Sequence, residues 1–346
     1  MDLPSMRIKT LLTGCAVFFT YSTVARSEPP TSQAAVKTHI SLRVNPFMDM
    51  HYFVRELVDG KDAMPPKLPG IDRAIETVRK INDELGSGLA WGFVEGSFAA
   101  CESVKEAAEM VARLPPSFNT RDGREIPVKN LAQRIVRAYE PLEKDYLKRI
   151  WPAHQKEIEE ARIRIEKELL PAQEACFTNI LRALGMTDPA MEIPVCLVAE
   201  APFPQGFTHR RHGNGAVCIV GVKSLTGSTM CEVILHECIH ALDIATEQSG
   251  SALQDLRGMM YRYKVKPKSR EFHDAPHTLI FVQAAATVRA VIDAAHKPYG
   301  VTAGYYAKVP AIAEIVTRAW QDHAVGKLGR EEAITQIARD VSRVNN

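Results

Sequence analysis

The spacing of apolar residues changes along the chain, and it predicts a mostly helical protein with a small sheet. Between about 47 and 140, apolar positions recur every three or four residues, which is typical of amphipathic helices. Breaks that contain Pro or Gly separate these stretches. We expect helices at 48–57, 71–85, 101–114 and 128–139.

A long, charged stretch from 141 to 184 also follows a helical pattern. Its apolar residues share one side of a helix and are Leu142, Tyr146, Ile150, Ile158, Ile165 and Leu169. Pro152 and Pro171 should kink or divide it, because proline lacks the backbone N–H that a helix interior needs.

Three apolar runs predict strands. The first alternates apolar and polar residues, and the other two are rich in β-branched residues. These runs are 39–44, 191–199 and 216–222, with a polar loop expected between the last two. Together with the helices, they predict an α+β fold that is mostly helical and has a small mixed sheet.

The last third of the chain returns to helical patterns. Ser228 or Thr229 can cap a helix that runs to about Gln248. Asp274 can cap a second helix, with Pro276 in its first turn, and this helix continues to about residue 295. Two more helices are expected at 309–324 and 330–344.

The N-terminus predicts export. Arg7 and Lys9 precede an apolar stretch at 10–25, and Thr23 and Ala25 fit the −3 and −1 positions of a cleavage site. We therefore expect a signal peptide at 1–26 and a secreted or periplasmic protein. The stretch is too short for a stable membrane span. Lipidation at Cys15 and an unprocessed, buried N-terminal strand are the alternatives.

Six cysteines remain after this segment. Cys231 and Cys238 are seven residues apart on one predicted helix, too far to bridge. Cys196 and Cys218 could pair if their strands are neighbours, and buried free thiols are the alternative. The formal net charge of +2 gives no support to nucleic-acid binding, which needs a strongly basic face.

The segment from His236 to His240 contains the candidate metal ligands and the candidate general base. Histidines four apart lie on one face of a helix, where two neutral imidazoles can bind one Zn²⁺. The carboxylate of Glu237 can reach a water on the metal without being a ligand. It can take the proton of that water and later return it to a leaving amine, as peptide hydrolysis requires.

This segment resembles the HExxH motif of the zincin superfamily of zinc metallopeptidases. The resemblance implies a zinc cofactor and a peptide or protein substrate. It also implies a sheet-edge strand beside the cleft that pairs with an extended substrate, a role expected of 216–222. We expect a largely helical region at 27–190, packed on a zincin-like catalytic region at 191–346.

The third metal ligand departs from the gluzincin pattern, because the later helix at about 275–295 contains no glutamate. His277 lies on the predicted buried stripe of that helix and is our expected third ligand. The competitors are His273, Glu271, Glu247 and Asp243. The histidine extension of the metzincins is also missing, since position 243 is Asp.

Other residues could support this site. Asp243 could accept the second ring proton of a ligand histidine or could be an ordinary surface acid. Tyr305 is the expected donor to the oxyanion. Tyr306, His273 and Arg289 are the alternatives. His209 and His212 are expected on a loop at the rim, where an accessory metal site is a further alternative.

Three functions fit these residues. The first is a zinc-dependent hydrolase, a peptidase with Glu237 as general base. The second is a zinc-containing binding protein on a zincin-like scaffold without proteolytic activity. The third is a helical interaction protein in which the motif is incidental. The intact Glu237 favours the first, because binding zinc does not require it.

Overall fold

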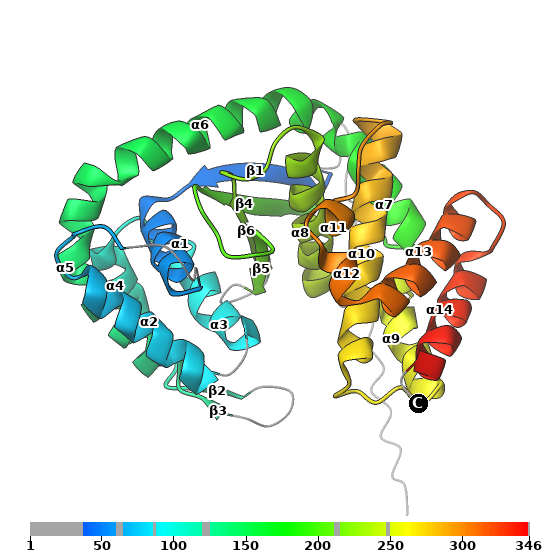
Figure 1. The fold of residues 1–346 in the computed structure, drawn as a ribbon, viewed down its shortest axis with the longest axis horizontal. Helices are drawn as coiled ribbons and strands as arrows, with labels where there is room; N and C mark the ends of the chain where they lie inside the picture. Colours follow the sequence, from blue (N-terminus) through cyan, green and yellow to red (C-terminus); the bar gives the residue numbers. More distant parts are fainter. Residues whose placement is uncertain are drawn as a thin grey trace, which may run out of the picture. The chain divides into compact units, whose positions relative to one another are not determined.

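A mixed four-stranded sheet lies at the centre of the described part of the chain, with helices on both of its faces (Figure 1). The computed structural model describes residues 37–59, 65–85, 88–119, 125–210, 215–246 and 250–344. All of them belong to one unit, Val36–Asn346. The predicted signal peptide at 1–26, Cys15, His212 and Glu247 lie outside the described residues.

The strands follow the order β1-β4-β6-β5. Their bounds are β1 His39–Val44, β4 Glu192–Val198, β5 Gly206–Arg210 and β6 Ala216–Gly221. The first three strands in this order are parallel, and β5 pairs antiparallel with β6. A separate two-stranded ribbon joins β2 Phe118–Asn119 to β3 Glu125–Ile126.

The helices form two groups along the chain. The first group is α1 Pro46–Asp59, α2 Ile71–Leu85, α3 Gly88–Phe98, α4 Val104–Arg113, α5 Val128–Arg149, α6 Trp151–Glu168, the 3₁₀ helix η1 Leu170–Ala172 and α7 Gln173–Leu184. The second group is α8 Ser228–Thr246, α9 Ala252–Arg262, α10 Arg270–Val291, α11 Tyr299–Thr302, α12 Tyr305–Lys308, α13 Pro310–Ala324 and α14 Arg330–Val344. The predicted fold class, mostly helical α+β with a small mixed sheet, is confirmed.

The two faces of the sheet belong to two different hydrophobic cores. Val195 and Leu197 of β4 point into a core with α6 to α10, α13 and α14. Cys196 and Val198 of the same strand point into a core with α1 to α5. This alternation follows from the two-residue period of a strand, and a strand buried on both faces is apolar throughout. The sheet therefore holds the helices α1 to α5 against one face and α8 against the other (Figure 1).

Several sequence predictions match the elements closely. The strand at 39–44 and the helix at 71–85 have the predicted bounds, and β1 does join the sheet. Pro152 lies in the first turn of α6 and Pro171 lies in η1, so both prolines divide the long helical stretch. Pro141, however, lies inside α5, so the helix expected at 128–139 and the start of the stretch expected from 141 form one continuous helix.

The start of α10 was predicted wrongly. The helix begins at Arg270, and Ser269 caps it by accepting a hydrogen bond from the backbone N–H of Phe272. Asp274 lies within the helix and pairs with Arg270 at 2.9 Å. A serine cap and an ion pair one turn apart support the added first turn, although Pro276 removes one backbone donor.

The segment between β4 and β6 was also predicted wrongly. Its second half, Gly206–Arg210, is strand β5 and not a loop. Because β5 forms the end of the sheet, β6 lies inside it, and 216–222 is not the edge strand that we expected. A run of only five residues, with Gly at one end and His and Arg at the other, is too short to indicate a strand by itself, so its pairing depends on the neighbouring strand.

All six described cysteines are buried free thiols. Cys196 and Cys218 lie on neighbouring strands, but Cys218 stands opposite Val195 in the register. Adjacent positions on a strand point to opposite faces, so the two side chains enter different cores. The disulfide that we considered between them does not form for this reason. Among the described residues, no helix is both long enough and apolar enough to span a membrane.

Candidate metal centre

Helix α8 is apolar around most of its circumference and is buried between β5, β6 and α10. A helix that is hydrophobic all round is typical of a protein interior. The polar side chains of His236 and Glu237 are consequently buried, at 3% and 4% exposure. Buried polar groups need partners, so their neighbours define the site.

Three histidines converge at this point. The Nε2 atom of His236 lies 3.1 Å from Nε2 of His277 and 3.2 Å from Nε2 of His240. His277 comes from α10, which packs along α8. All three nitrogen atoms lie within 4.8 Å of one another, so the three residues could hold a metal ion.

The surroundings keep these imidazoles neutral. Burial lowers the pKa of His236 well below its ordinary value, and the nearby His240 and His277 lower it further. Burial and His277 also lower the pKa of His240, and burial lowers that of His277 to about 4. Neutral imidazoles have the free lone pairs that a metal ion requires.

The nitrogen spacing fits a tetrahedral ion. Zinc–nitrogen bonds of 2.0–2.1 Å place two ligand nitrogens about 3.3 Å apart in a tetrahedral site. The two shortest separations here, 3.1 Å and 3.2 Å, are close to that value. The ring of His236 is held by packing, with its centroid 4.0 Å from that of Phe281, while its Nδ1 atom is buried and has no partner among the described residues.

The carboxylate of Glu237 lies beside the three histidines. Its Oε1 atom is 3.9 Å from Nε2 of His236, too long for a direct hydrogen bond but short enough for one water to bridge the two atoms. Its Oε2 atom accepts a hydrogen bond of 2.6 Å from the hydroxyl of Thr208. Burial raises the pKa of Glu237 to about 8, although the Thr208 hydrogen bond acts in the opposite direction.

Tyr305 packs against the third histidine. Its ring centroid lies 5.3 Å from that of His277 and 4.6 Å from that of Phe281. Its hydroxyl is buried near Thr278 without a well-formed hydrogen bond. Tyr306 packs against Phe281 from another direction, with a centroid separation of 6.4 Å.

The other candidates for the site have different partners. Asp243 binds the guanidinium of Arg257 through both oxygens, at 3.1 Å and 2.7 Å, and makes no hydrogen bond to a histidine of the described chain. Arg289 is exposed and donates to the backbone oxygen of His296 at 2.9 Å. His273 is exposed on α10, one turn before His277.

His209 is buried and is not the solvated rim residue that we expected. It lies on β5 with its Nε2 atom 2.8 Å from Glu95 and 3.1 Å from the hydroxyl of Tyr52. Glu95 also binds His51 and the guanidinium of Arg55. A cation already neutralises this carboxylate, so the cluster is an internal ion network and not a second metal site.

Sequence reasoning missed Thr208 and Gly206, which both contact Glu237. Their common position on one face of β5 could have been recognised only from the alternation of Gly206 and Thr208 with Phe207 and His209. That run has only five residues, and Phe207 and Thr208 are its only strand formers. It was therefore taken for a loop.

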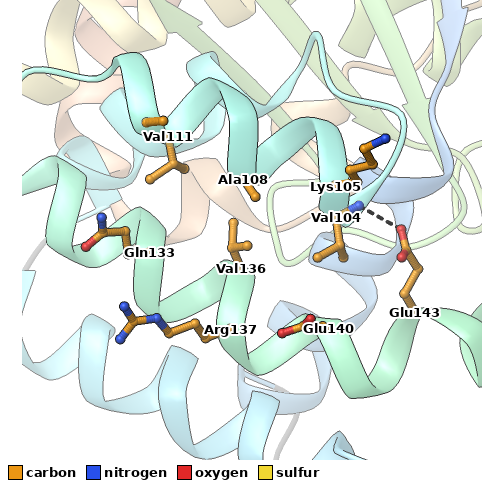
Figure 2. Close-up of a pocket in the computed structure, with 10 residues that line it drawn as sticks. Val104, Lys105, Ala108, Val111, Gln133, Val136, Arg137, Glu140 and Glu143 are labelled. Carbon is orange, nitrogen blue, oxygen red and sulfur yellow. Dashed lines mark hydrogen bonds between the residues drawn. The ribbon is translucent and has the colours of Figure 1, made fainter.

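A surface cavity of about 550 Å³ lies elsewhere, between α4 and α5 (Figure 2). Both basic and acidic residues line it, including Lys105, Arg137 and Glu140. At one end, the Glu143 carboxylate accepts a hydrogen bond of 2.7 Å from the backbone N–H of Val104 at the start of α4 (Figure 2). None of its lining residues belongs to the histidine cluster, so this cavity is separate from the candidate metal centre.

Comparison with known proteins returned no match to this chain, whether with family models, curated proteins or solved structures.

Proposed function

We propose that this protein is a zinc-dependent hydrolase, and specifically a peptidase of the HExxH type on a zincin-like scaffold. The observation that carries the proposal is the convergence of three imidazole nitrogens, from His236, His240 and His277, beside the buried carboxylate of Glu237. Three imidazole ligands with a fourth position left open are typical of catalytic zinc. A site built only to hold a metal would not need the adjacent buried acid.

The choice of zinc rests on the donor set. Neutral imidazoles suit zinc as well as copper, iron and nickel, whereas oxygen donors would favour magnesium or calcium. The separations of the His236 nitrogen from the other two are close to those of tetrahedral coordination. When bound, such an ion would polarise a carbonyl group and make a water molecule acidic enough to lose a proton near neutral pH.

Residues of the chain would transfer the proton, hold the ion and bind the oxyanion. Glu237 would take the proton of the attacking water and then deliver it to the leaving amine. His236, His240 and His277 would hold the ion in one place. Tyr305, whose buried hydroxyl lacks a well-formed hydrogen bond, would donate to the oxyanion of the intermediate.

Strand β5 gives the proposal a position for a peptide. It is the last strand of the sheet and lies directly beside α8. Its half-buried Thr208 contacts Glu237, whereas the backbone oxygen of Arg210 lies against Gly96 of α3. An extended peptide could add to the exposed part of this edge through backbone hydrogen bonds.

Metal analysis and one substitution test this function. The purified protein should contain about one zinc ion per chain, and replacing both His236 and His240 with Ala should remove it. Wild type should cleave members of a broad quenched-fluorescent peptide library. Glu237→Gln should keep the zinc and lose the cleavage, because the amide cannot accept the proton. Equal inertness of wild type and the variant, with zinc present, would contradict the peptidase and leave a metal-binding protein.

A further inference from the structure

We propose that Thr208 is a positioning residue, which fixes the carboxylate of Glu237 toward the three histidines. This inference rests on the proposed function, because it assigns Thr208 to the general base of that reaction. The hydroxyl of Thr208 lies 2.6 Å from Oε2 of Glu237 and 3.0 Å from the backbone oxygen of the same residue. Because the hydroxyl contacts both the backbone oxygen and the carboxylate of Glu237, it restricts the conformation of that side chain relative to its own backbone.

The Thr208 hydroxyl can form a hydrogen bond with the Glu237 side chain both before and after that side chain takes a proton. It has one proton and two lone pairs, so it donates to the carboxylate while Glu237 is ionised. Once Glu237 has taken a proton from water, the same hydroxyl can accept from the acid and turn its own proton to the Glu237 backbone oxygen at 3.0 Å. Neither valine nor alanine can make either contact.

Gly206 confines the carboxylate from the other side. It lies two residues before Thr208 and therefore on the same face of β5. A Cβ atom at Gly206 would lie 2.5 Å from Oε1 of Glu237, so this carboxylate oxygen lies directly against the backbone of the strand. The Glu237 side chain is thus bounded by Gly206 at one oxygen and by Thr208 at the other.

The strand that carries Thr208 is itself fixed from its opposite face. His209 points away from Glu237 and binds the buried Glu95 at 2.8 Å. A Cβ atom at Gly92 of α3 would lie 3.2 Å from Nδ1 of His209, so the helix backbone approaches this ring closely. Thr208 is therefore held on a strand with little freedom to move, as a positioning residue requires.

The test compares Thr208→Val with Thr208→Ser. Valine keeps the shape but removes the hydroxyl, and serine retains the hydroxyl. In Thr208→Val we expect kcat to fall about 10- to 100-fold on the library peptide that wild type cleaves best. KM and zinc content should stay unchanged, because Thr208 contacts neither the ligand nitrogens nor the sheet edge with its hydroxyl. Thr208→Ser should recover most of kcat.

Two further measurements separate positioning from folding. Thr317→Val, the same change at a half-buried threonine of α13, should leave kcat and the melting temperature near wild type. In crystals of the zinc-free Thr208→Val protein, the Glu237 carboxylate should leave its place between Gly206 and residue 208 or occupy two positions. An unchanged kcat together with an unchanged carboxylate would overturn the role of Thr208. If wild type cleaves no peptide, the proposed function fails, and the crystallographic result alone then decides whether Thr208 positions Glu237.

Discussion

His236 and His277 are 41 residues apart in the chain, yet their Nε2 atoms lie 3.1 Å apart. The first belongs to α8 and the second to α10, and the two helices pack along one another. The candidate metal centre is therefore not a property of the motif alone. It depends on the packing of a second helix that brings one more imidazole to the same point.

Removing the third imidazole should reduce metal binding without unfolding the protein. In His277→Ala we expect the affinity for Zn²⁺ to fall by more than about 100-fold, because even groups that merely support a ligand are worth 10- to 100-fold. Competition with a zinc-binding dye measures this. His273→Ala is the matched control, since His273 is exposed on the same helix and should not affect the affinity. Equal affinities in the two variants would mean that His277 is not a ligand.

Gly206 should be intolerant of a side chain. A Cβ atom there would meet Oε1 of Glu237 at 2.5 Å, which is closer than nonbonded atoms approach. Gly206→Ala should displace the Glu237 carboxylate and reduce peptide cleavage, while zinc content stays at the wild-type level. The measurements are kcat and metal content on the same preparation.

Gly258 provides the comparison for this variant. It lies on the exposed side of α9, and an added Cβ would meet nothing within 4 Å. Gly258→Ala should leave activity unchanged and stabilise the protein by up to about 1 kcal/mol, because alanine favours a helix over glycine. If Gly206→Ala is as active as Gly258→Ala, the close contact between Gly206 and Glu237 is not needed for activity.

Glu95 should be important for stability. Its carboxylate is fully buried and lies near His51 and His209, at 2.9 Å and 2.8 Å, as well as the guanidinium of Arg55. Arg55 and the two histidines hold the pKa of Glu95 well below its usual range against the effect of burial. Glu95→Gln would leave Arg55 buried without a counter-charge, so we expect a loss of about 3–5 kcal/mol in the free energy of unfolding.

Urea unfolding of Glu95→Gln checks this value. Glu76→Gln is the control, because Glu76 is exposed on α2 and pairs with Lys80, at 62% side-chain exposure for each partner. An exposed pair of this kind contributes at most about 1 kcal/mol. A Glu95 variant no less stable than the Glu76 variant would show that the buried network is dispensable.

The parts of the fold that the sequence predicts are those with long, regular patterns. The helix at 71–85 was predicted with its observed bounds, because its apolar positions follow a helical period over four turns. The paired histidines of the motif were predicted to share a face for the same reason, since four residues make about one helical turn.

The parts that were missed depend on contacts distant in sequence. Strand β5 is stabilised as a strand by its pairing with β6, a contact that a five-residue run does not reveal. With β5 unrecognised, Thr208 could not be connected to Glu237, and the edge of the sheet was assigned to the wrong strand. The sequence left open whether Cys196 and Cys218 pair or stay free thiols for a related reason, because a one-residue offset in register decides which face a side chain enters.

The buried pair of His154 and Asp49 should make stability depend on pH. Burial alone would lower the pKa of His154, but the hydrogen bond and charge of Asp49, 2.8 Å from Nδ1, outweigh it and the pKa is raised. A raised folded-state pKa means that the pair stabilises fully below the ordinary histidine pKa of about 6.5 and that this contribution is lost as the pH rises through the folded-state value. We therefore expect His154→Gln to destabilise the protein more at about pH 6 than at about pH 9.

Unfolding free energies of wild type and His154→Gln in urea, both zinc-free, measure this pH dependence, since the titration of the other histidines cancels in the difference. His273→Gln, at an exposed position, should show no such change. A His154→Gln effect that is constant between the two pH values would mean that the Asp49 pair is not charged in the folded protein.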